Sequence, residues 1–301
     1  MSRQLRVTVV VDNTLFRTDL LSEHGVSFWI EAGDQRILFD TGQGPALQLN
    51  AKSLGIELAT ANAIALSHGH YDHGGGLANA WTATERRPLY LHAAALATRY
   101  RDAKMIGLPQ PVRELVEQHM DAVRFSDRPT EIAPGVWLTG YLPRRHPEEA
   151  AEPEPFFFDS AGQQHDPLLD DQALYFVTNT GVIVLLGCAH AGVINTLEYV
   201  SELTGGAPLR LVIGGLHLRA VSKQRLTWTV AKLQLLNPQL LVPAHCTGEP
   251  ATAALAATFG ERCRTCLSGN SPETGTLLII LNKINSMGMG VDSREIKVLH
   301  R

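Results

Sequence analysis

The sequence has few cysteines, little imbalance of charge and no long hydrophobic run. Four cysteines in 301 residues do not make a disulfide scaffold, so we expect a reducing compartment. The 26 basic and 30 acidic side chains give a net charge of −4, which argues against a protein that binds nucleic acid through bulk positive charge. A transmembrane helix needs about 20 consecutive apolar residues, and no run of the sequence approaches that length. We therefore expect no association with a membrane.

The composition indicates a globular chain. Hydrophobic residues make up 45% of the sequence and charged residues 19%, which is enough apolar material to bury a sizeable core. The first residues turn acidic at Asp12 before the apolar segment of a signal peptide develops, so we expect a cytoplasmic protein. The length alone suits one large domain or two ordinary ones.

Segments of strand character alternate with segments of helix character along the chain. Strands are predicted over 6–12, 24–32, 36–40, 61–66, 88–91, 123–126, 136–139, 173–179, 182–186, 209–213, 240–243 and 276–281. Helices are predicted over 45–54, 77–82, 93–100, 193–203, 222–236 and 251–259. This alternation indicates an α/β layered fold, and the early hairpin makes its sheets mixed. We assign 1–285 to a single domain and 286–301 to a C-terminal tail without a clear apolar period, which we expect to be flexible.

A long irregular segment, 144–171, interrupts this alternation. It is rich in proline and carries the run Phe156–Phe158 in polar surroundings. Loops of this length inside a compact domain are usually functional or disordered. The phenylalanines favour a lid that packs back over a site, and a surface insertion or an oligomer contact is the alternative.

The strongest chemical signal is the string His68-Gly-His-Tyr-Asp-His73. It follows a short apolar strand and precedes three glycines. In an extended segment alternate side chains share a face, so His68 and His70 can converge on one cation. Asp72 and His73 come after the chain turns and can reach a second cation. Neutral imidazole and carboxylate suit Zn²⁺, and also Fe²⁺ or Mn²⁺.

This string resembles the signature of the metallo-β-lactamase superfamily of hydrolases. The resemblance implies an αββα sandwich of two mixed β-sheets flanked by helices, with one or two metal ions along one edge of the sheets. The upstream segment Phe39-Asp40-Thr41-Gly42 is similar to the first motif of that superfamily. Asp40 is thereby expected to support the ligands from outside, by accepting a hydrogen bond from a metal-bound imidazole. A helix cap or a turn is the alternative role.

The rest of the chain is similar to one subgroup of this superfamily, which includes an archaeal enzyme that joins a dihydropterin to a ribofuranosyl-aminobenzene phosphate. The resemblance covers about residues 6–250 and rests on segments that occur in the same order, namely 12–13, 24–25, 139–144, 171–174, 187–192, 195, 214–217 and 243–248. It implies that Asn13 and His24 contribute to substrate binding.

Three later histidines each follow a predicted strand at the end where α/β sites are built. We predict His190 and His245 as further metal ligands. His217 is either a ligand or a residue that contacts substrate and exchanges protons. Arg144 follows another predicted strand, and its planar guanidinium suits a phosphate or carboxylate of the substrate. A solvated loop is the alternative for Arg144.

The sequence departs from the superfamily at the carboxylate that usually bridges two metals. The strand that should end in Gly-Asp ends in Gly187-Cys188, so a bridging carboxylate is not evident. We interpret Cys188 as a buried thiol beneath the site, with metal ligation as the alternative. The expected cofactor is Zn²⁺ as one or two ions, with Mn²⁺ or Fe²⁺ as alternatives.

These features predict a metal-dependent hydrolase that directs a metal-activated water at a small phosphorylated or ester substrate. Asp72 would orient the nucleophile, and His217 would serve as acid or base. The resemblance also implies an alternative transferase that joins a dihydropterin pyrophosphate to an arylamine. An iron-dependent redox enzyme and a non-catalytic metal-binding sensor are further alternatives. The expected partner is a small molecule, and assembly into a homo-oligomer is left open.

Overall fold

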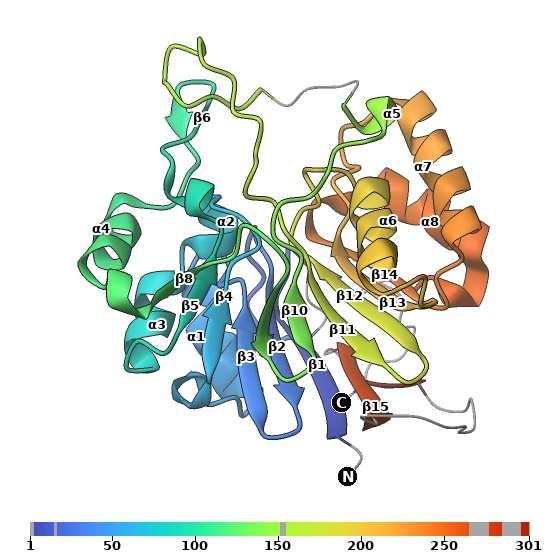
Figure 1. The fold of residues 1–301 in the computed structure, drawn as a ribbon, viewed down its shortest axis with the longest axis horizontal. Helices are drawn as coiled ribbons and strands as arrows, with labels where there is room; N and C mark the ends of the chain where they lie inside the picture. The colour runs from blue at the N-terminus through green and yellow to red at the C-terminus, as the bar shows by residue number, and fades with distance from the viewer. Residues whose placement is uncertain (1–2, 15–16, 151–154, 265–276, 285–295, 301) are drawn as a thin grey trace.

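Two mixed β-sheets face each other in the computed structural model, and helices cover the outer face of each sheet (Figure 1). The structure describes residues 3–14, 17–150, 155–264, 277–284 and 296–300. The expected αββα sandwich is confirmed. Within the described ranges, none of the helices combines the length and apolar character needed to cross a bilayer.

The first sheet joins both ends of the chain. Its strand order is β16-β15-β1-β2-β3-β4-β5-β8. The bounds are β1 Arg3–Val11, β2 Ser27–Ala32, β3 Gln35–Phe39, β4 Ala63–Ala65, β5 Leu89–Leu91, β8 Val123–Phe125, β15 Leu277–Ile284 and β16 Ile296–His300. Strands β3, β4, β5 and β8 run parallel. The outer face of this sheet packs on α1 Pro45–Ser53, α3 Leu77–Ala83 and α4 Gln110–Gln118.

The second sheet has the order β14-β13-β12-β11-β10-β9. Its bounds are β9 Thr130–Ala133, β10 Val136–Leu138, β11 Leu174–Thr178, β12 Gly181–Leu186, β13 Leu209–Gly215 and β14 Leu241–Ala244. Its outer face packs on α6 Val193–Leu203, α7 Lys223–Leu236 and α8 Glu249–Phe259. The short helix α5 Pro147–Ala150 lies beside α7.

The pattern of apolar residues explains why both faces of the second sheet are covered. In β12, Ile183 and Leu185 belong to the core between the sheets, whereas Val182, Val184 and Leu186 face the helices. Strands buried on both faces read as continuous apolar runs. The same logic holds in β1, where alternate residues enter the core between the sheets.

Two sequence predictions are corrected by the structure. The helix predicted over 93–100 is only a 3-10 turn, Ala93–Leu96, and Tyr100–Arg101 is the extended strand β6, because the intervening Arg99 is drawn into buried ion pairs. Part of the segment predicted as a tail, 296–300, is strand β16, which pairs antiparallel with β15. The β-branched residues Ile296 and Val298 suit a strand, and the glycine- and methionine-rich stretch before them obscures that signal.

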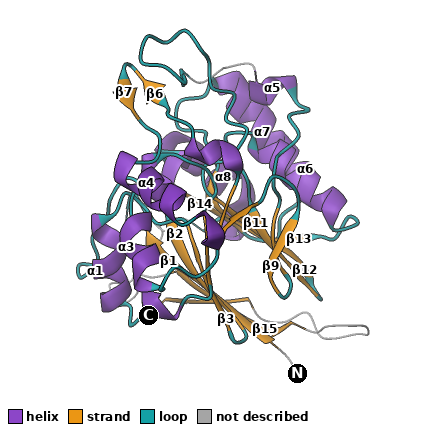
Figure 2. Ribbon diagram, turned by 60° about the vertical axis from the view of Figure 1, so that its left-hand side comes forward, coloured by secondary structure: helices purple, strands orange, loops and turns teal. Residues whose placement is uncertain are grey.

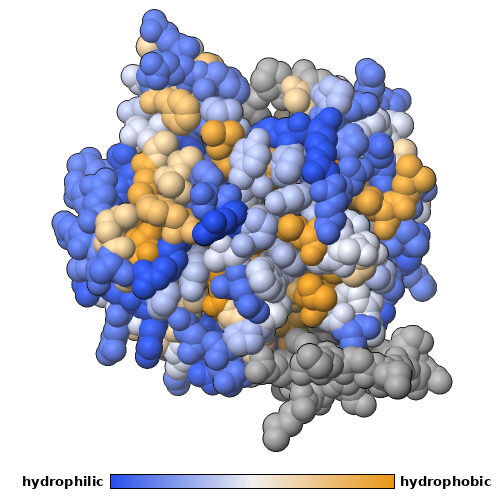
Figure 3. All heavy atoms as spheres, in the orientation of Figure 1, coloured by the Kyte–Doolittle hydropathy of each residue, from blue (hydrophilic) through white to orange (hydrophobic). Residues whose placement is uncertain are grey.

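The carboxyl ends of β3, β4, β12, β13 and β14 meet along one edge of the sandwich (Figures 1 and 2). Above this edge stands the hairpin of β6 and β7 Lys104–Met105, with the segment that follows residue 154 beside it. On the face drawn in Figure 3, the coloured residues mix apolar with polar side chains and form no broad apolar patch. The edge with the strand ends is therefore the place to look for chemistry.

Candidate metal centre

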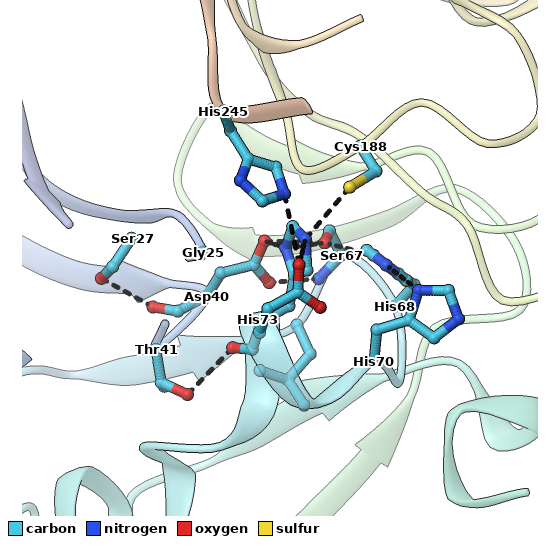
Figure 4. A network of polar contacts seen from close by, with 12 residues as sticks. Gly25, Ser27, Asp40, Thr41, Ser67, His68, His70, His73, Cys188 and His245 are labelled. Carbon is cyan, nitrogen blue, oxygen red and sulfur yellow. Dashed lines mark hydrogen bonds and ion pairs between the residues drawn. The ribbon is translucent and has the colours of Figure 1, made fainter. Parts of the chain in front are cut away.

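Six predicted ligands gather at the edge where the strands end. His68 and His70 lie in the loop after β4, and the short helix α2 Tyr71–Gly74 carries Asp72 and His73. The other two, His190 and His245, follow β12 and β14. All six side chains are buried, although they come from three separate segments of the chain, at 68–73, 190 and 245. Figure 4 shows how several of them point toward one another.

Three histidines form the first group. The ring centroids of His68, His70 and His190 lie 4.6, 4.8 and 5.0 Å apart. Burial lowers the pKa of His68 and of His70 well below the usual value, so both imidazoles are neutral near pH 7 and can offer a lone pair. His68 Nε2 and His70 Nδ1 are 2.9 Å apart, and two such nitrogens share either a proton or a cation. This donor set fits a divalent metal.

Asp72, His73 and His245 form the second group. The carboxylate oxygen Oδ2 of Asp72 lies 3.7 Å from Nε2 of His73 and 3.4 Å from Nε2 of His245. Burial alone would raise the pKa of Asp72, but His73 and His245 outweigh it and hold that pKa well below its usual range. Asp72 is therefore an ionised carboxylate between imidazoles, which also fits a divalent cation.

Asp40 orients this second group from below. Its carboxylate accepts hydrogen bonds from His73 Nδ1 at 2.8 Å and from the backbone N–H and hydroxyl of Ser67, each at 2.7 Å. The Nδ1–H bond directs Nε2 of His73 toward Asp72 and Cys188. Asp40 thus lies where its predicted supporting role requires.

The loop that carries His245 is fixed from the N-terminal strand. Asp12 accepts the backbone N–H of His245 at 2.9 Å, and burial raises the pKa of Asp12 to about 6. The side-chain oxygen of Asn13 lies 2.9 Å from Nδ1 of His245.

Four residues of the site have left-handed backbone angles, namely Asp40, Ala189, His217 and His245. Non-glycine residues rarely do so, and such strain concentrates at functional sites.

A cavity of 670 Å³ opens beside both groups. His24, His70, Asp72, His190, His217 and His245 contribute to its wall. The ring of Phe156 covers part of it, 5.0 Å from the His70 ring and 5.7 Å from the His190 ring. Arg101, Arg219 and Arg225 also line the cavity. The site therefore combines metal-type donors, an apolar cover and cationic side chains.

Buried ion pairs tie the metal loop to the segment that carries Phe156. Arg99 donates to Asp166 at 2.5 Å and to both oxygens of Asp170, at 2.6 and 2.9 Å. Asp170 also accepts the backbone N–H of Gly69, between two predicted ligands, at 2.7 Å. The cover and the ligands are thus parts of one hydrogen-bonded unit.

We expect metal affinity to rise with pH between 7 and 9. Burial would lower the pKa of His73, but the carboxylates of Asp72 and Asp40 raise it to about 9. Because a cation must displace that proton, binding strengthens as the pH approaches 9. The stability of the metal-free fold depends on pH in the opposite sense. Protonated His73 contributes stability that is fully present below about pH 6.5 and is lost as the pH rises through 9.

Calorimetric titration of the metal-free protein with Zn²⁺ tests this, in buffers of different ionisation enthalpy. The expected result is proton release at pH 7 that declines toward pH 9. In the Asp40→Asn variant the release should begin to decline at lower pH, because one of the two carboxylates that hold the proton is gone. Affinity that is constant between pH 7 and 9 would contradict the protonated state of His73.

Of the four residues predicted to contact substrate, two line the cavity and two do not. His24 and His217 line the cavity, and Nε2 of His24 lies 3.2 Å from Asp72. Asn13 instead holds His245 in place. Arg144 donates to the backbone carbonyls of His190, Pro167 and Leu168 and is not among the residues that line the cavity. It braces the His190 loop against the segment that covers the site.

Several residues of the site escape prediction from sequence. Arg99, Asp166 and Asp170 form ion pairs between segments about 70 residues apart, which local patterns do not encode. In the sequence, Arg219 looks like an ordinary loop residue and Arg225 like an ordinary surface residue in the first turn of a helix. Their only signal is position, since both closely follow the loop that carries His217.

Comparisons with known proteins agree with this geometry. A family model described as the metallo-beta-lactamase superfamily matches residues 23–245. An uncharacterized protein of Methanocaldococcus jannaschii is 30% identical over 252 residues, which cover 83% of this chain and 93% of that protein. The 7,8-dihydropterin-6-methyl-4-(beta-D-ribofuranosyl)-aminobenzene-5'-phosphate synthase of the same organism is 27% identical over 270 residues, which cover 84% of this chain and 91% of the synthase.

Solved structures agree as well. A metal-dependent hydrolase of the β-lactamase superfamily has a TM-score of 0.73 and 27% identity, and the match covers 93% of this chain and 100% of that one. A metallo-β-lactamase fold protein from Bacillus subtilis has a TM-score of 0.54 at 14% identity, covering 92% of this chain and 99% of its own, which bears on the fold alone. The family match spans most of the chain and contains all six predicted ligands. The chain therefore belongs to the metallo-β-lactamase superfamily.

Proposed function

We propose that this protein is a metal-dependent hydrolase that acts on a small phosphorylated or ester substrate. The observation that carries the proposal is the cavity whose wall combines members of both groups of metal-type donors with three arginines. Imidazole and carboxylate donors favour Zn²⁺, as one or two ions, over Mn²⁺ or Fe²⁺. Free buried thiols at Cys188, Cys246 and Cys263 suit the cytoplasm.

A divalent cation in this site would lower the pKa of a coordinated water to about 7 and polarise the bond to be cleaved. The protein supplies the remaining functions. The ionised carboxylate of Asp72 faces the cavity and can accept a hydrogen bond from the nucleophile, which orients it. His217 also lines the cavity, and its proposed role is to give a proton to the leaving group. Phe156 excludes water from the His70 and His190 side.

Arg225 supports an anionic substrate. Its side chain lines the cavity although the residue is only 8% exposed, and among the described residues its buried Nε has no hydrogen-bond partner. The nearby Glu149 interacts with Arg225 through its charge, but its oxygens accept the backbone N–H groups of Ile194 and Asn195. A buried N–H donor without a hydrogen bond is costly, and a phosphate or carboxylate group of a ligand would satisfy it.

The Arg225→Met variant should raise KM for phosphorylated substrates about 10- to 100-fold with a smaller effect on kcat, because a hydrogen bond to a charged group is worth about 1.5–3 kcal/mol. Hydrolysis of a neutral ester should change little. Steady-state kinetics with both substrate types measures this. The matched control is Arg210→Met in strand β13. Its Nε is likewise buried without a partner among the described residues, but its guanidinium donates to Gln239 and it does not line the cavity. Equal losses for charged and neutral substrates would argue against phosphate recognition by Arg225.

The second candidate is a transferase that joins a dihydropterin pyrophosphate to an arylamine. The observation that favours it is the 27% identity to the pterin synthase over most of both chains. The same donors and arginines would then hold the diphosphate leaving group, while an amine takes the place of water.

Elemental analysis of the purified protein, coupled to assays on a phosphodiester, a lactone and a pterin pyrophosphate, tests the proposal. The pterin assay is run with and without an arylamine. Zinc or manganese with water-dependent turnover supports hydrolysis, whereas turnover that requires the arylamine supports the transferase. Bound iron with redox activity, or metal without any turnover, would overturn both. His70→Ala should lose metal and activity together.

A further inference from the structure

Cys188 occupies the position that the two metal-type groups share. Its sulfur lies within 4.8 Å of ligand atoms of His68 and His190 on one side, and of His73 and His245 on the other. The distance from Cys188 Sγ to His73 Nε2 is 3.1 Å. Figure 4 shows the sulfur pointing toward the histidines rather than into the core of the second sheet. The side chain is buried, at 3% exposure, yet it also lines the cavity.

Tight backbone packing fixes this sulfur in place. At Gly187, a Cβ atom would lie 2.0 Å from Ser67 Oγ and 3.0 Å from an oxygen of Asp40. At Gly215, a Cβ atom would lie 3.2 Å from the Cα of Cys188. The end of β12 can therefore approach the Asp40–Ser67 pair closely only because glycine stands at these positions. The approach places the next side chain, Cys188, between the two groups.

The charges of the donors leave a role for a second anion. The first group consists of three imidazoles, and Asp72 is the carboxylate of the second. Asp171, the other acid near His190, is used as an acceptor for the backbone N–H of Ala191. Two divalent cations would thus face one anionic protein ligand. A thiolate at the shared position would add a second negative charge within reach of both.

We propose that Cys188 bridges two divalent metal ions as a thiolate, one ion held with His68, His70 and His190 and the other with Asp72, His73 and His245. Coordination forms the metal–sulfur bonds and releases the thiol proton to solvent, without a change of oxidation state. Metal–sulfur bonds of about 2.3 Å let one sulfur reach two ions about 3.5–4 Å apart. A thiolate also favours zinc, cobalt and iron over magnesium and manganese.

The competing assignment is Cys246. With Cys188 and His217 it forms another group of donors within 4.8 Å. It is also buried, and its thiol donates to the backbone carbonyl of Cys188 at 3.5 Å. Because Cys246 is a free buried thiol of the same cavity, Cys246→Ser is the matched control for any substitution of Cys188.

Cobalt titration of the metal-free protein tests the bridge, because thiolate ligation gives Co²⁺ a charge-transfer band in the near ultraviolet. In the wild type this band should grow until two equivalents are bound. Cys246→Ser should keep it. Cys188→Asp should bind two equivalents, because it restores a carboxylate, but should lose the band. A band that survives in Cys188→Asp, or that disappears in Cys246→Ser alone, would assign the sulfur to Cys246 and overturn the proposal.

X-ray absorption of the zinc-loaded wild type makes the test independent of whether variants fold. The proposal expects one sulfur scatterer for each zinc, at about 2.3 Å. Zinc coordinated by nitrogen and oxygen alone would reject it. The proposal rests on the proposed metal centre and not on the reaction. A protein with the sulfur signature and no hydrolysis would therefore refute the proposed function alone, and active protein without the signature would refute the bridge alone.

Discussion

Replacing Asp72 with Asn should lower kcat/KM about 10³-fold, within the range lost when a positioned acid or base is removed. The substitution keeps the size of the side chain and removes its charge. Asp72 is buried and faces three imidazoles, with Nε2 of His24 nearest, at 3.2 Å. An amide would neither balance the charge of a cation in the second group nor orient the nucleophile. Because both losses slow the same chemical step, kcat/KM should fall further than in a variant that removes only one hydrogen bond to a metal-type side chain.

Steady-state kinetics and metal analysis measure the Asp72→Asn effect. Metal bound by the second group should fall, while His68, His70 and His190 retain theirs. Asp40→Asn is an informative comparison, because it disturbs His73 only through a hydrogen bond and should cost about 10- to 100-fold. Asp121→Asn, at an exposed site on the outer helical layer, should change nothing. Retention of full metal content and more than a tenth of the activity in Asp72→Asn would refute its assigned role.

The metal-type residues could be predicted because their signal is local. The spacing of His68, His70, Asp72 and His73 places them together whatever the rest of the chain does. His190 and His245 were predictable for a second reason, since each follows an apolar run that has to be a buried strand. The parallel strands then bring their ends to one edge. Local order and strand direction were thus enough to assemble six side chains.

Other parts of the site depend on contacts that no local pattern specifies. Asn13 and Arg144 sit on loops near the cavity, and sequence could not decide whether they face a substrate or the protein. Their hydrogen bonds show that they hold the His245 and His190 loops. The position of Cys188 between both groups follows from the close approach of β12 to Asp40 and Ser67. That approach is a property of packing between the two sheets, which a strand pattern does not reveal.

No local sequence pattern indicates the ion pairs of Arg99, and we expect their loss to lower the free energy of unfolding substantially. Arg99 is 0% exposed and its guanidinium is shared between Asp166 and Asp170. Removing one partner of a buried pair leaves an uncompensated charge, at a cost of about 3–5 kcal/mol. Arg99→Met should therefore lower Tm by about 10 °C, given about 2–4 °C per kcal/mol for chains of about 150–250 residues and somewhat less for a longer chain.

Metal affinity should fall as well in Arg99→Met, because Asp170 would no longer hold the N–H of Gly69 between His68 and His70 in a fixed place. Thermal unfolding followed by circular dichroism and zinc titration measure the two effects. The control is Arg145→Met, which removes a bidentate pair with Glu202 on the exposed surface and should leave both Tm and affinity unchanged.

A triple variant separates charge from position. Arg99→Met combined with Asp166→Asn and Asp170→Asn removes the uncompensated carboxylates, so it should recover most of the lost Tm. It should not recover the zinc affinity, because the neutral amide introduced by Asp170→Asn would accept the Gly69 N–H more weakly than the native carboxylate does. If affinity returned together with Tm, the ion pairs would serve stability alone. If it stayed low while Tm recovered, Arg99 and Asp170 would be positioning residues for the metal loop.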